Sequence, residues 1–357
     1  MLLFLIPRYN RGVLAMSSEQ LPIAVDALGG DHAPKVVIEG AVEAGIPVFL
    51  VGPEKELAGL LESVSNPRFV QIVHAETGIR MDEHPLQAIR AKKDSSLMVA
   101  IRLVKEGRAA GVMSAGNTGA LTVGATMTLG RLPQVTRPAA AIPIPTPCGQ
   151  SLLLDAGAAA ECTVEDLLNY AIMGSTYAKL IWGIQNPRIG LLSIGEEENK
   201  GSRQARDTHR LLKGSGLNFI GNVQGSDLGS TAADVIVTDG FTGNVALKAG
   251  EGFARLIMGI VREELKAGGM FQKLAALTLR PVLERIKKRI DWEEYGGGAL
   301  LGVSGNVVIA HGKSGKRAIA NAIRLTSELA RTDLLHQLEE SLRQYHTVDA
   351  SSGKQGS

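Results

Sequence analysis

A strand, a polar turn and a helix follow one another in DVIVTDGFTGN, residues 234–244, and in VALKAGEGFARLIMGIVREEL, which continues it to residue 265. The apolar run at 235–237 is typical of a buried strand, and the apolar residues after 244 recur at helical spacing. Gly240 and Gly243 permit a tight turn between the two elements. The order of strand, glycine-rich turn and helix is the repeating unit of α/β proteins.

The same order recurs along the chain. Runs typical of strands lie at 22–26, 47–52, 68–74, 109–116, 151–157, 188–195, 217–223 and 234–240. Stretches able to form helices follow them, for example at 34–44 and 164–182. This alternation predicts a three-layer α/β/α protein with a mostly parallel sheet, in which ligands bind at the carboxyl ends of the strands.

The composition supports an α/β enzyme. Of the 357 residues, 45% are hydrophobic but only 4% are aromatic, and 42 are glycine, which favours an aliphatic interior with many tight loops. A net charge of +2 is too small to predict a nucleic-acid partner, so any basic surface must be local. Cys148 and Cys162 form neither a CxxC pair nor a disulfide framework, which is typical of a reducing compartment.

A single domain is expected over residues 21–335, because no linker-like composition interrupts them. Residues 1–20 contain an apolar run too short for a signal peptide, and we expect them to form a disordered extension. The polar tail at 347–357 is also expected to be disordered. The chain contains no run of about 18 apolar residues, so the sequence predicts no membrane-spanning helix.

The loop DALGGDHAP, residues 26–34, is a candidate anion site. Gly29 and Gly30 allow close backbone approach, and Asp31 and His32 lie near the start of the next predicted helix. The free amide groups of a helix start suit a bound anion. A capped strand-to-helix turn without a ligand is an equal alternative. The GxGxxG spacing of a dinucleotide site is absent.

The loop SAGNTGA, residues 114–120, offers neutral donors for an oxyanion or a phosphate in Ser114, Asn117 and Thr118. It lacks the GxSxG pattern of a nucleophile elbow, so we do not expect Ser114 to act as a nucleophile.

The loop SIGEEENKGS, residues 193–202, places Lys200 after a predicted strand, where its ammonium group can reach an anion. The alternative is a charged and solvated helix start. In the opening stretch, Asp239, Thr242 and Asn244 follow the strand, and the Asn244 amide is the type of neutral donor that stabilises a developing oxyanion. A simple Asx cap is the alternative there.

His311 follows a further predicted strand, in the segment HGKS. This segment is not a phosphate-binding P-loop, because position 307 holds valine where that motif requires glycine. His311 is a candidate acid/base or phosphate contact, and a structural histidine is the alternative.

Taken together, these loops resemble those of the bacterial phosphate acyltransferases known as PlsX, which convert acyl-carrier-protein thioesters into acyl phosphates for phospholipid synthesis. The matching strings occur in order across residues 23–315: IAVDALGGDHAP, SAGNTGAL, LLLDAGA, IGEEENKG, GNVQG, VTDGFTGNVALK, YGGGALLG and AHGKS. One departure is Ala159, where the family usually has asparagine, so a polar contact at that position is lost or supplied by a neighbour.

The resemblance implies the two-lobed α/β/α fold that isocitrate and isopropylmalate dehydrogenases share with phosphotransacetylases, and usually a homodimer. It implies acyl carrier protein and inorganic phosphate as substrates and no redox cofactor. The residues agree, since the chain has no nucleotide fingerprint and no metal-ligand cluster of recognisable spacing. We therefore expect neither a cofactor nor a metal.

In the expected reaction, phosphate attacks the thioester carbonyl and the carrier thiol leaves, so no catalytic triad is required. The predicted catalytic residues are Lys200, Asn244, Asp239 and His311, with Lys200 neutralising charge, Asn244 donating to the oxyanion and Asp239 orienting a neighbour. The predicted substrate and phosphate contacts are Gly29, Gly30, Asp31, His32, Ser114, Asn117, Thr118 and Thr242.

Other functions remain open at this stage. A phosphotransacetylase-like enzyme would use the same chemistry on coenzyme A thioesters. A dehydrogenase of the same fold would bind NAD or NADP without a GxGxxG loop. A non-catalytic membrane scaffold is disfavoured by the many polar glycine loops after strands.

A basic amphipathic helical segment is predicted at 262–292. Within 270–292, apolar residues share one helical face, and the predicted membrane or carrier-protein surface is Leu279, Arg280, Leu283, Arg285, Ile286, Lys287, Lys288 and Arg289. An ordinary core-facing helix with a solvated basic side is the alternative. The resemblance favours a cytoplasmic protein attached peripherally to the membrane, where a downstream membrane acyltransferase takes up its product.

Overall fold

The computed structural model describes residues 21–267, 269, 278, 279, 281, 282, 284–286, 289 and 294–352. The strands are β1 Ile23–Asp26, β2 Val48–Gly52, β3 Val70–His74, β4 Gly111–Ser114, β5 Ala139–Thr146, β6 Gly149–Leu154, β7 Ile189–Leu192, β8 Phe219–Val223, β9 Val235–Val237, β10 Gly298–Leu301 and β11 Val307–Ile309. The helices are α1 Lys35–Ala44, α2 Glu54–Glu62, α3 Pro85–Ala91, α4 Ser96–Lys105, α5 Thr118–Leu129, α6 Val164–Trp182, α7 Arg203–Gly214, α8 Gly240–Ala267, α10 Lys316–Arg331 and α11 Leu334–Ser352, with a short 3-10 turn at Gly225–Asp227.

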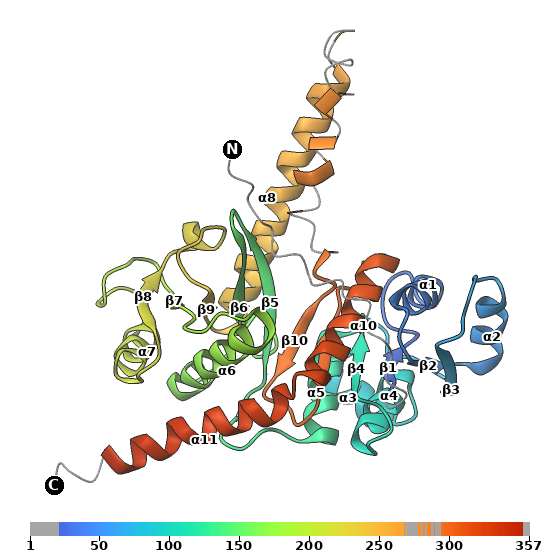
Figure 1. The fold of residues 1–357 in the computed structure, drawn as a ribbon, viewed down its shortest axis with the longest axis horizontal. Helices are drawn as coiled ribbons and strands as arrows, with labels where there is room; N and C mark the ends of the chain where they lie inside the picture. The colour runs from blue at the N-terminus through green and yellow to red at the C-terminus, as the bar shows by residue number, and fades with distance from the viewer. Residues whose placement is uncertain are drawn as a thin grey trace.

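The described strands form one mixed sheet in the order β3-β2-β1-β4-β11-β10-β5-β6-β9-β7-β8 (Figure 1). All eight strands predicted up to residue 240 are present, and so is the further strand predicted before His311, which is β11. They form two parallel sets, one from β3 through β1 and β4 to β11, and the other from β6 through β9 and β7 to β8. Strands β10 and β5 join the two sets through antiparallel pairs, so strand direction reverses at the centre of the sheet.

Helices cover both faces of the sheet, which confirms the predicted three layers. Ile23 and Val25 lie in a core with residues of α1, α6, α10 and α11, whereas Ala24 between them lies in a second core with residues of α3, α4 and α5. Successive strand residues point to opposite faces, so one strand serves both cores. The first core contains residues from both parallel sets, and the two lobes are therefore packed as one unit.

Strand β5 was not predicted, because Pro143 and Pro145 interrupt its apolar run. Proline supplies no N–H to a sheet and is confined to edges and bulges. The structure satisfies this rule, since β10 pairs only with Ala139–Ala141 and the proline-containing half of β5 has β6 alone as its partner.

The C-terminal tail corrects another prediction. Helix α11 continues to Ser352, so residues 347–352 are helical rather than disordered, and the folded unit extends beyond residue 335. Leu334, Leu338 and Leu342 are buried at helical spacing and anchor α11 to the core. A helix that is nucleated by packing extends at little further cost. The predictions for 1–20 and 353–357 lie outside the described residues.

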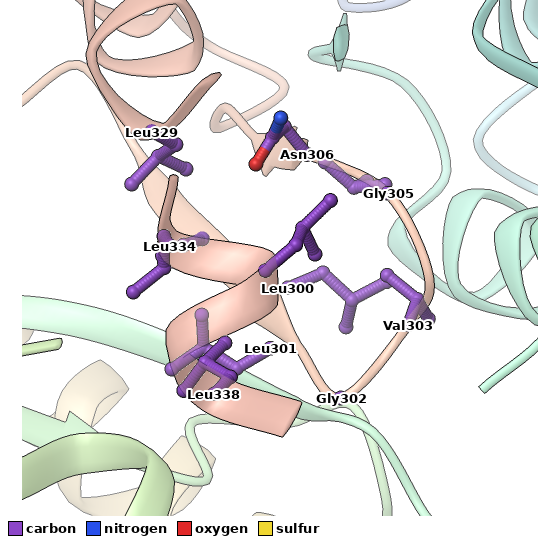
Figure 2. A pocket seen from close by; sticks show the side chains of 12 residues that line it. Leu300, Leu301, Gly302, Val303, Gly305, Asn306, Leu329, Leu334 and Leu338 are labelled. Carbon is purple, nitrogen blue, oxygen red and sulfur yellow. The ribbon is translucent and has the colours of Figure 1, made fainter. Parts of the chain in front are cut away.

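A small cavity lies beneath the corner between α10 and α11 (Figure 2). Its lining is mostly aliphatic, with Leu300, Leu334 and Leu338 around it and the Asn306 amide at its rim. Its volume is about 10 Å³, whereas roughly 10–15 Å³ is needed for a single water. The cavity is a packing feature, and none of its lining residues was predicted to contact substrate.

Candidate active site

Three predicted loops meet after β1, β4 and β11, which are neighbours in the sheet. We call residues 26–32, 114–118 and 311–314 the first loop cluster. The Asp31 N–H donates to the Gly312 carbonyl at 2.7 Å, and the Ala310 N–H donates to the Ser114 carbonyl at 2.9 Å. Gly29 and Gly30 lie between these loops, against Gly116 and Gly312, while the side chains of Asp31 and His32 are exposed.

Asp26 organises the first loop cluster, although sequence reasoning did not select it. Its buried carboxylate accepts hydrogen bonds from the hydroxyls of Ser96 at 2.5 Å and Ser114 at 2.7 Å, and from the Leu28 N–H at 3.3 Å. Burial raises the pKa of this carboxyl. The Ser114 hydroxyl also accepts from the Gly116 N–H at 3.0 Å, so it holds the loop in shape.

Asn117 likewise uses its side chain for structure. Its Oδ1 caps α5 by accepting from the Ala120 N–H at 3.0 Å. Its Nδ2 donates to the carbonyls of Arg80, Met81 and Glu83 at 2.9–3.3 Å. A phosphate contact by Asn117 therefore stays a prediction that would require these bonds to be exchanged. Thr118, the first residue of α5, is half-buried beside it.

His311 is half-buried at the end of β11. Burial lowers its imidazole pKa, and the positive charges of Lys248 and Lys313 lower that pKa further. Its Nδ1 accepts from the Lys313 N–H at 3.1 Å, so the neutral ring carries its proton on Nε2. Lys248 belongs to α8, and this helix therefore approaches the first loop cluster. On α8, Lys248 pairs with Glu251 at 2.9 Å.

The second loop cluster consists of residues 155–162, 193–202 and 238–244, which follow the adjacent strands β6, β7 and β9. Helix α8 begins inside it at Gly240, earlier than the sequence indicated. Gly240 and Gly243 are thus helical residues rather than turn residues. A Cβ at Gly240 would lie 2.4 Å from the Ala159 carbonyl oxygen, and one at Gly243 would lie 1.9 Å from that of Asp155. Close packing explains both glycines.

Asp239 and Thr242 form the cap at the start of α8. The Asp239 carboxylate accepts from the Thr242 N–H at 2.8 Å and from the Thr242 hydroxyl at 2.7 Å. This is the capping role that the sequence left open. Asn244, in the same first turn, is exposed, and its amide has no hydrogen-bond partner among the residues that the structure describes.

Lys200 lies in a loop that other side chains hold in place. The Asn222 Nδ2 donates to the Glu197 carbonyl at 2.9 Å, and Lys213 pairs with Glu198 at 2.8 Å. The Lys200 N–H donates to the Glu197 carbonyl at 3.0 Å. Within the described part of the chain, the exposed Lys200 ammonium has no ion-pair partner despite three neighbouring glutamates. It remains available to an anion.

An open cavity of about 550 Å³ lies in the second loop cluster, within the range typical of small-ligand sites. Its lining consists of Ala160, Glu161, Cys162, Gln204, Asp239 and Phe241. Two of these lining residues lie near the candidate donors. Gln204, in the first turn of α7, is four residues after Lys200, and Asp239, just before α8, is five residues before Asn244. Burial and the charges of Asp239, Asp166 and Asp155 raise the pKa of the Cys162 thiol to about 12, so this thiol is not a nucleophile at neutral pH.

The two loop clusters are connected by α8. Lys248 lies one helical turn, about 5.4 Å, beyond Asn244. Lys248 is close enough to His311 to lower its pKa. The start of α8 therefore faces the first loop cluster, even though the two sets of strands run in opposite directions. Within the described ranges, no group of three or more acidic, histidine or cysteine side chains is arranged to hold a metal.

The predicted membrane or carrier surface is described in part. Leu279 and Ile286 are 48% and 44% exposed, Arg285 is exposed, and the Arg289 guanidinium donates to the Pro147 carbonyl in the turn between β5 and β6. Arg280, Leu283, Lys287 and Lys288 lie outside the described residues. Among the helices that are described, none has the length and apolar character needed to cross a membrane.

Sequence reasoning missed an apolar stripe on α8. Its members are Phe253, Leu256, Ile257 and Ile260, each at least 50% exposed. Their spacing places them on one helical face, which was a usable signal. The helix projects from the body of the molecule (Figure 1).

Comparisons with known proteins show the family. A family model described as a fatty acid synthesis protein matches residues 21–337. A phosphate acyltransferase of Desulfitobacterium hafniense (strain DSM 10664 / DCB-2) is 45% identical over 328 residues, covering 90% of this chain and 98% of its own length. One of Aquifex aeolicus (strain VF5) is 42% identical over 329 residues, covering 90% and 97%.

Solved structures show the fold. A phosphotransacetylase from Streptococcus pyogenes aligns with a TM-score of 0.59 at 16% identity, covering 88% of this chain and 95% of its own. The EutD phosphotransacetylase from Staphylococcus aureus aligns with a TM-score of 0.56 at 15% identity, with the same coverage. The fold is thus that of phosphotransacetylases, and the curated relatives establish the family. The chain belongs to the phosphate acyltransferase family of fatty acid and phospholipid synthesis.

Proposed function

We propose that the protein transfers a fatty acyl group from acyl carrier protein to inorganic phosphate, giving an acyl phosphate for phospholipid synthesis. An oxygen of phosphate attacks the thioester carbonyl carbon and forms a tetrahedral oxyanion. The carbon–sulfur bond then breaks, and the carrier leaves as a thiolate that takes up a proton. Phosphate is already ionised at neutral pH, so the reaction needs positioning and charge stabilisation more than a general base.

The observation that carries this proposal is the pair of available donors in the second loop cluster. The Asn244 amide and the Lys200 ammonium have no partners in the described part of the chain. Asn244 lies in the first turn of α8 and Lys200 three residues before α7, and the first turns of both helices contribute residues to the lining of the large cavity. The Asn244 amide donates to the oxyanion, and Lys200 neutralises its charge or that of phosphate. Asp239 holds the start of α8 in place.

Phosphate lies on the side of the first loop cluster. The backbone around Gly29 and Gly30, the start of α5 at Thr118 and the neutral imidazole of His311 provide donors there. Ser114 and Asn117 shape this cluster through the bonds described above. Lys248, which lies one helical turn from Asn244, adds positive charge between the two sides.

The test follows release of the free carrier thiol from long-chain acyl carrier protein, with and without inorganic phosphate, together with acyl phosphate trapped by hydroxylamine. Release that depends on phosphate, with matching product, is expected. Turnover of acyl coenzyme A alone would move the enzyme to the phosphotransacetylase alternative. Stabilisation of the fold by NAD or NADP without any acyl transfer would favour the dehydrogenase alternative.

Removing one oxyanion donor typically lowers turnover by about a hundredfold to a thousandfold. We expect Lys200→Ala and Asn244→Ala to do so without unfolding the chain, because both side chains are exposed. Matched controls are Lys179→Ala, near the end of α6, and Asn218→Ala, whose amide bonds the Asn186 carbonyl before β8. If either site variant kept near-normal turnover while the controls behaved as expected, that residue's assignment would be wrong.

We also infer a homodimer and peripheral attachment to the membrane. The exposed stripe on α8 suits a second copy of the chain, because an apolar face of this kind is unfavourable in water. The segment at 262–292 suits a surface of anionic lipid or an acidic carrier protein, since its described part combines exposed apolar residues with arginine.

A further inference from the structure

Asp155 is a buried carboxylate at the end of β6 that none of the roles above uses. It accepts hydrogen bonds from four backbone N–H groups, those of Ala140, Gly157, Ala158 and Ala159, at 2.7–3.0 Å. Its side chain is fully buried. Its own N–H donates to the Thr238 carbonyl at 3.0 Å. One carboxylate therefore ties the loop after β6 to β5, while its backbone ties the end of β6 to that of β9.

The loop that Asp155 shapes is in direct contact with the start of α8. The Ala159 carbonyl accepts from the Gly240 N–H at 3.0 Å. A Cβ on Gly157 would lie 3.3 Å from the Cβ and Cγ of Asn244, so the Gly157 backbone sits directly against the Asn244 side chain. The position of Asn244 is thus set by a loop whose own shape depends on Asp155.

The two carboxylate oxygens have unequal roles. Oδ1 accepts from Ala140, Gly157 and Ala158, whereas Oδ2 accepts from Ala159. The bond from Ala159 is the one next to α8, because the carbonyl of the same residue accepts from Gly240. An asparagine at 155 retains the Oδ1 acceptor but places an NH2 group opposite the Ala159 N–H. The asparagine NH2 group and the Ala159 N–H are both donors, so the hydrogen bond between residues 155 and 159 is lost. This is the bond that leads to the start of α8.

We propose that Asp155 is a positioning residue that holds Asn244 in its reactive orientation through the loop at 157–159. This inference rests on the proposed role of Asn244 as the oxyanion donor. A donor that is misplaced by about 1 Å can cost roughly a hundredfold in rate. Because the effect is on the oxyanion, it appears in kcat, whereas the affinity for phosphate in the first loop cluster is retained.

The experiment compares Asp155→Asn, Asn244→Ala and the double variant, with kcat and the KM for phosphate measured on acyl carrier protein thioester. Asp155→Asn is expected to lower kcat by about a hundredfold with the KM for phosphate within about twofold. In the Asn244→Ala background the same change is expected to cost less than about threefold, because the group that it positions is already gone. Losses that multiply in the double variant, or a raised KM with normal kcat, would overturn the inference.

Ser151→Ala is the matched control. Ser151 is buried within β6, four residues before Asp155, and its hydroxyl donates to the Ala233 carbonyl at 2.6 Å. The variant removes a buried polar contact from the same strand without touching the loop at 157–159. Its kcat is expected to stay normal in both backgrounds, which separates a general loss of strand stability from a loss of positioning.

Gly157→Ala gives a second route if Asp155→Asn does not fold. Gly157 is exposed and has a φ of 126°, and the added methyl group would lie 3.3 Å from the Cβ and Cγ of Asn244 and press on this side chain. Gly157→Ala should lower kcat as Asp155→Asn does, and it should have little effect on kcat in the Asn244→Ala background. Full turnover in Gly157→Ala would contradict the proposed contact.

The two hypotheses fail differently. If Asn244→Ala alone keeps near-normal turnover, the proposed role of Asn244 is wrong, whatever Asp155→Asn does. If Asn244→Ala is crippled and Asp155→Asn is normal or strictly multiplicative with it, only the role of Asp155 is wrong. Far-UV circular dichroism and thermal melting establish that each variant is folded.

Discussion

Two buried aspartates shape the two loop clusters: Asp26 is the last residue of β1, and Asp155 directly follows β6. Asp26 accepts from two serine hydroxyls, and Asp155 accepts from four backbone N–H groups. Burial raises the pKa of both carboxyls, since the charged form loses its hydration. Each therefore holds its loop in shape at a cost in solvation.

Asp26 makes the stability of the fold depend on pH. Its pKa is raised above the ordinary value of 3.8, so the folded state binds this proton more tightly than the unfolded chain does. As the pH rises from that ordinary value through the raised one, the Asp26 contribution to the free energy of unfolding falls. We expect Asp26→Asn to remove this part of the decline, so that the free energy of unfolding of wild type minus that of the variant decreases with increasing pH. Urea denaturation across that pH range measures it.

Asp82→Asn provides the control. The exposed Asp82 carboxylate pairs with Arg80 at 3.0 Å, and this pair lowers its pKa. A carboxyl group with a lowered pKa adds to the free energy of unfolding as the pH rises. Removing the Asp82 carboxylate therefore changes the pH dependence of stability in the sense opposite to that of Asp26→Asn. Parallel stability curves for wild type and Asp26→Asn would contradict the prediction for Asp26.

At the level of residues, the sequence predicted where the polar loops lie but not which of their atoms are available. Ser114 bonds Asp26, 88 positions earlier, and Asn117 bonds carbonyls 34–37 positions earlier. No local pattern reports such contacts. Asp26 and Asp155 lie in two of the loop motifs that resemble the family. An aspartate at the end of a strand is nevertheless typical of an ordinary turn, and only its hydrogen-bond partners show its role.

Among the elements, the periodic ones were predictable and the central ones were not. Strands β1 and β9 are recognisable in the sequence as apolar runs that precede glycine-rich loops. Strand β5 carries two prolines, and β10 begins at the last of three consecutive glycines, so neither has the composition of a strand by itself. Pairing across the sheet overrides propensity for both. The reversal of direction at these strands was therefore also beyond local reasoning.

Helix α8 leads to a prediction about assembly. Its stripe of Phe253, Leu256, Ile257 and Ile260 is exposed over its projecting length (Figure 1). We expect the double variant Leu256→Glu, Ile257→Glu to convert a homodimer into monomers, because two buried carboxylates at an apolar interface are strongly unfavourable. Light scattering during gel filtration measures the mass.

Met127→Glu is the matched control for the α8 variant. Met127 is 59% exposed on α5 and belongs to no such stripe, so its change should leave the mass unaltered. A wild-type protein that elutes as a monomer at all concentrations would refute the proposed dimer outright.

For the whole molecule, the proposed attachment to lipid can be tested with vesicles. The described part of the 262–292 segment contains exposed Leu279 and Ile286 together with exposed Arg285. Vesicles rich in anionic lipid should sediment the protein and salt should release it, whereas neutral vesicles should bind much less. Each basic residue near the surface contributes about 1 kcal/mol, so Arg285→Gln should weaken binding by about fivefold.

The control for this experiment is Lys179→Gln, an exposed lysine near the end of α6. It removes the same charge from a helix with no proposed lipid contact, and its binding should equal that of wild type. Equal partitioning to anionic and neutral vesicles would remove the electrostatic part of the proposal.

The two prolines of β5 also matter for how the whole chain behaves in a crowded cell. Among the described strands, the outer half of β5 has only β6 as a neighbour, and an open strand edge of this kind can recruit strands from other molecules. At Pro143 and Pro145 that edge presents no amide hydrogen to a foreign backbone. The β5 edge of the hairpin can therefore extend past β10 while offering no amide hydrogen bond at these two positions to a strand of another molecule.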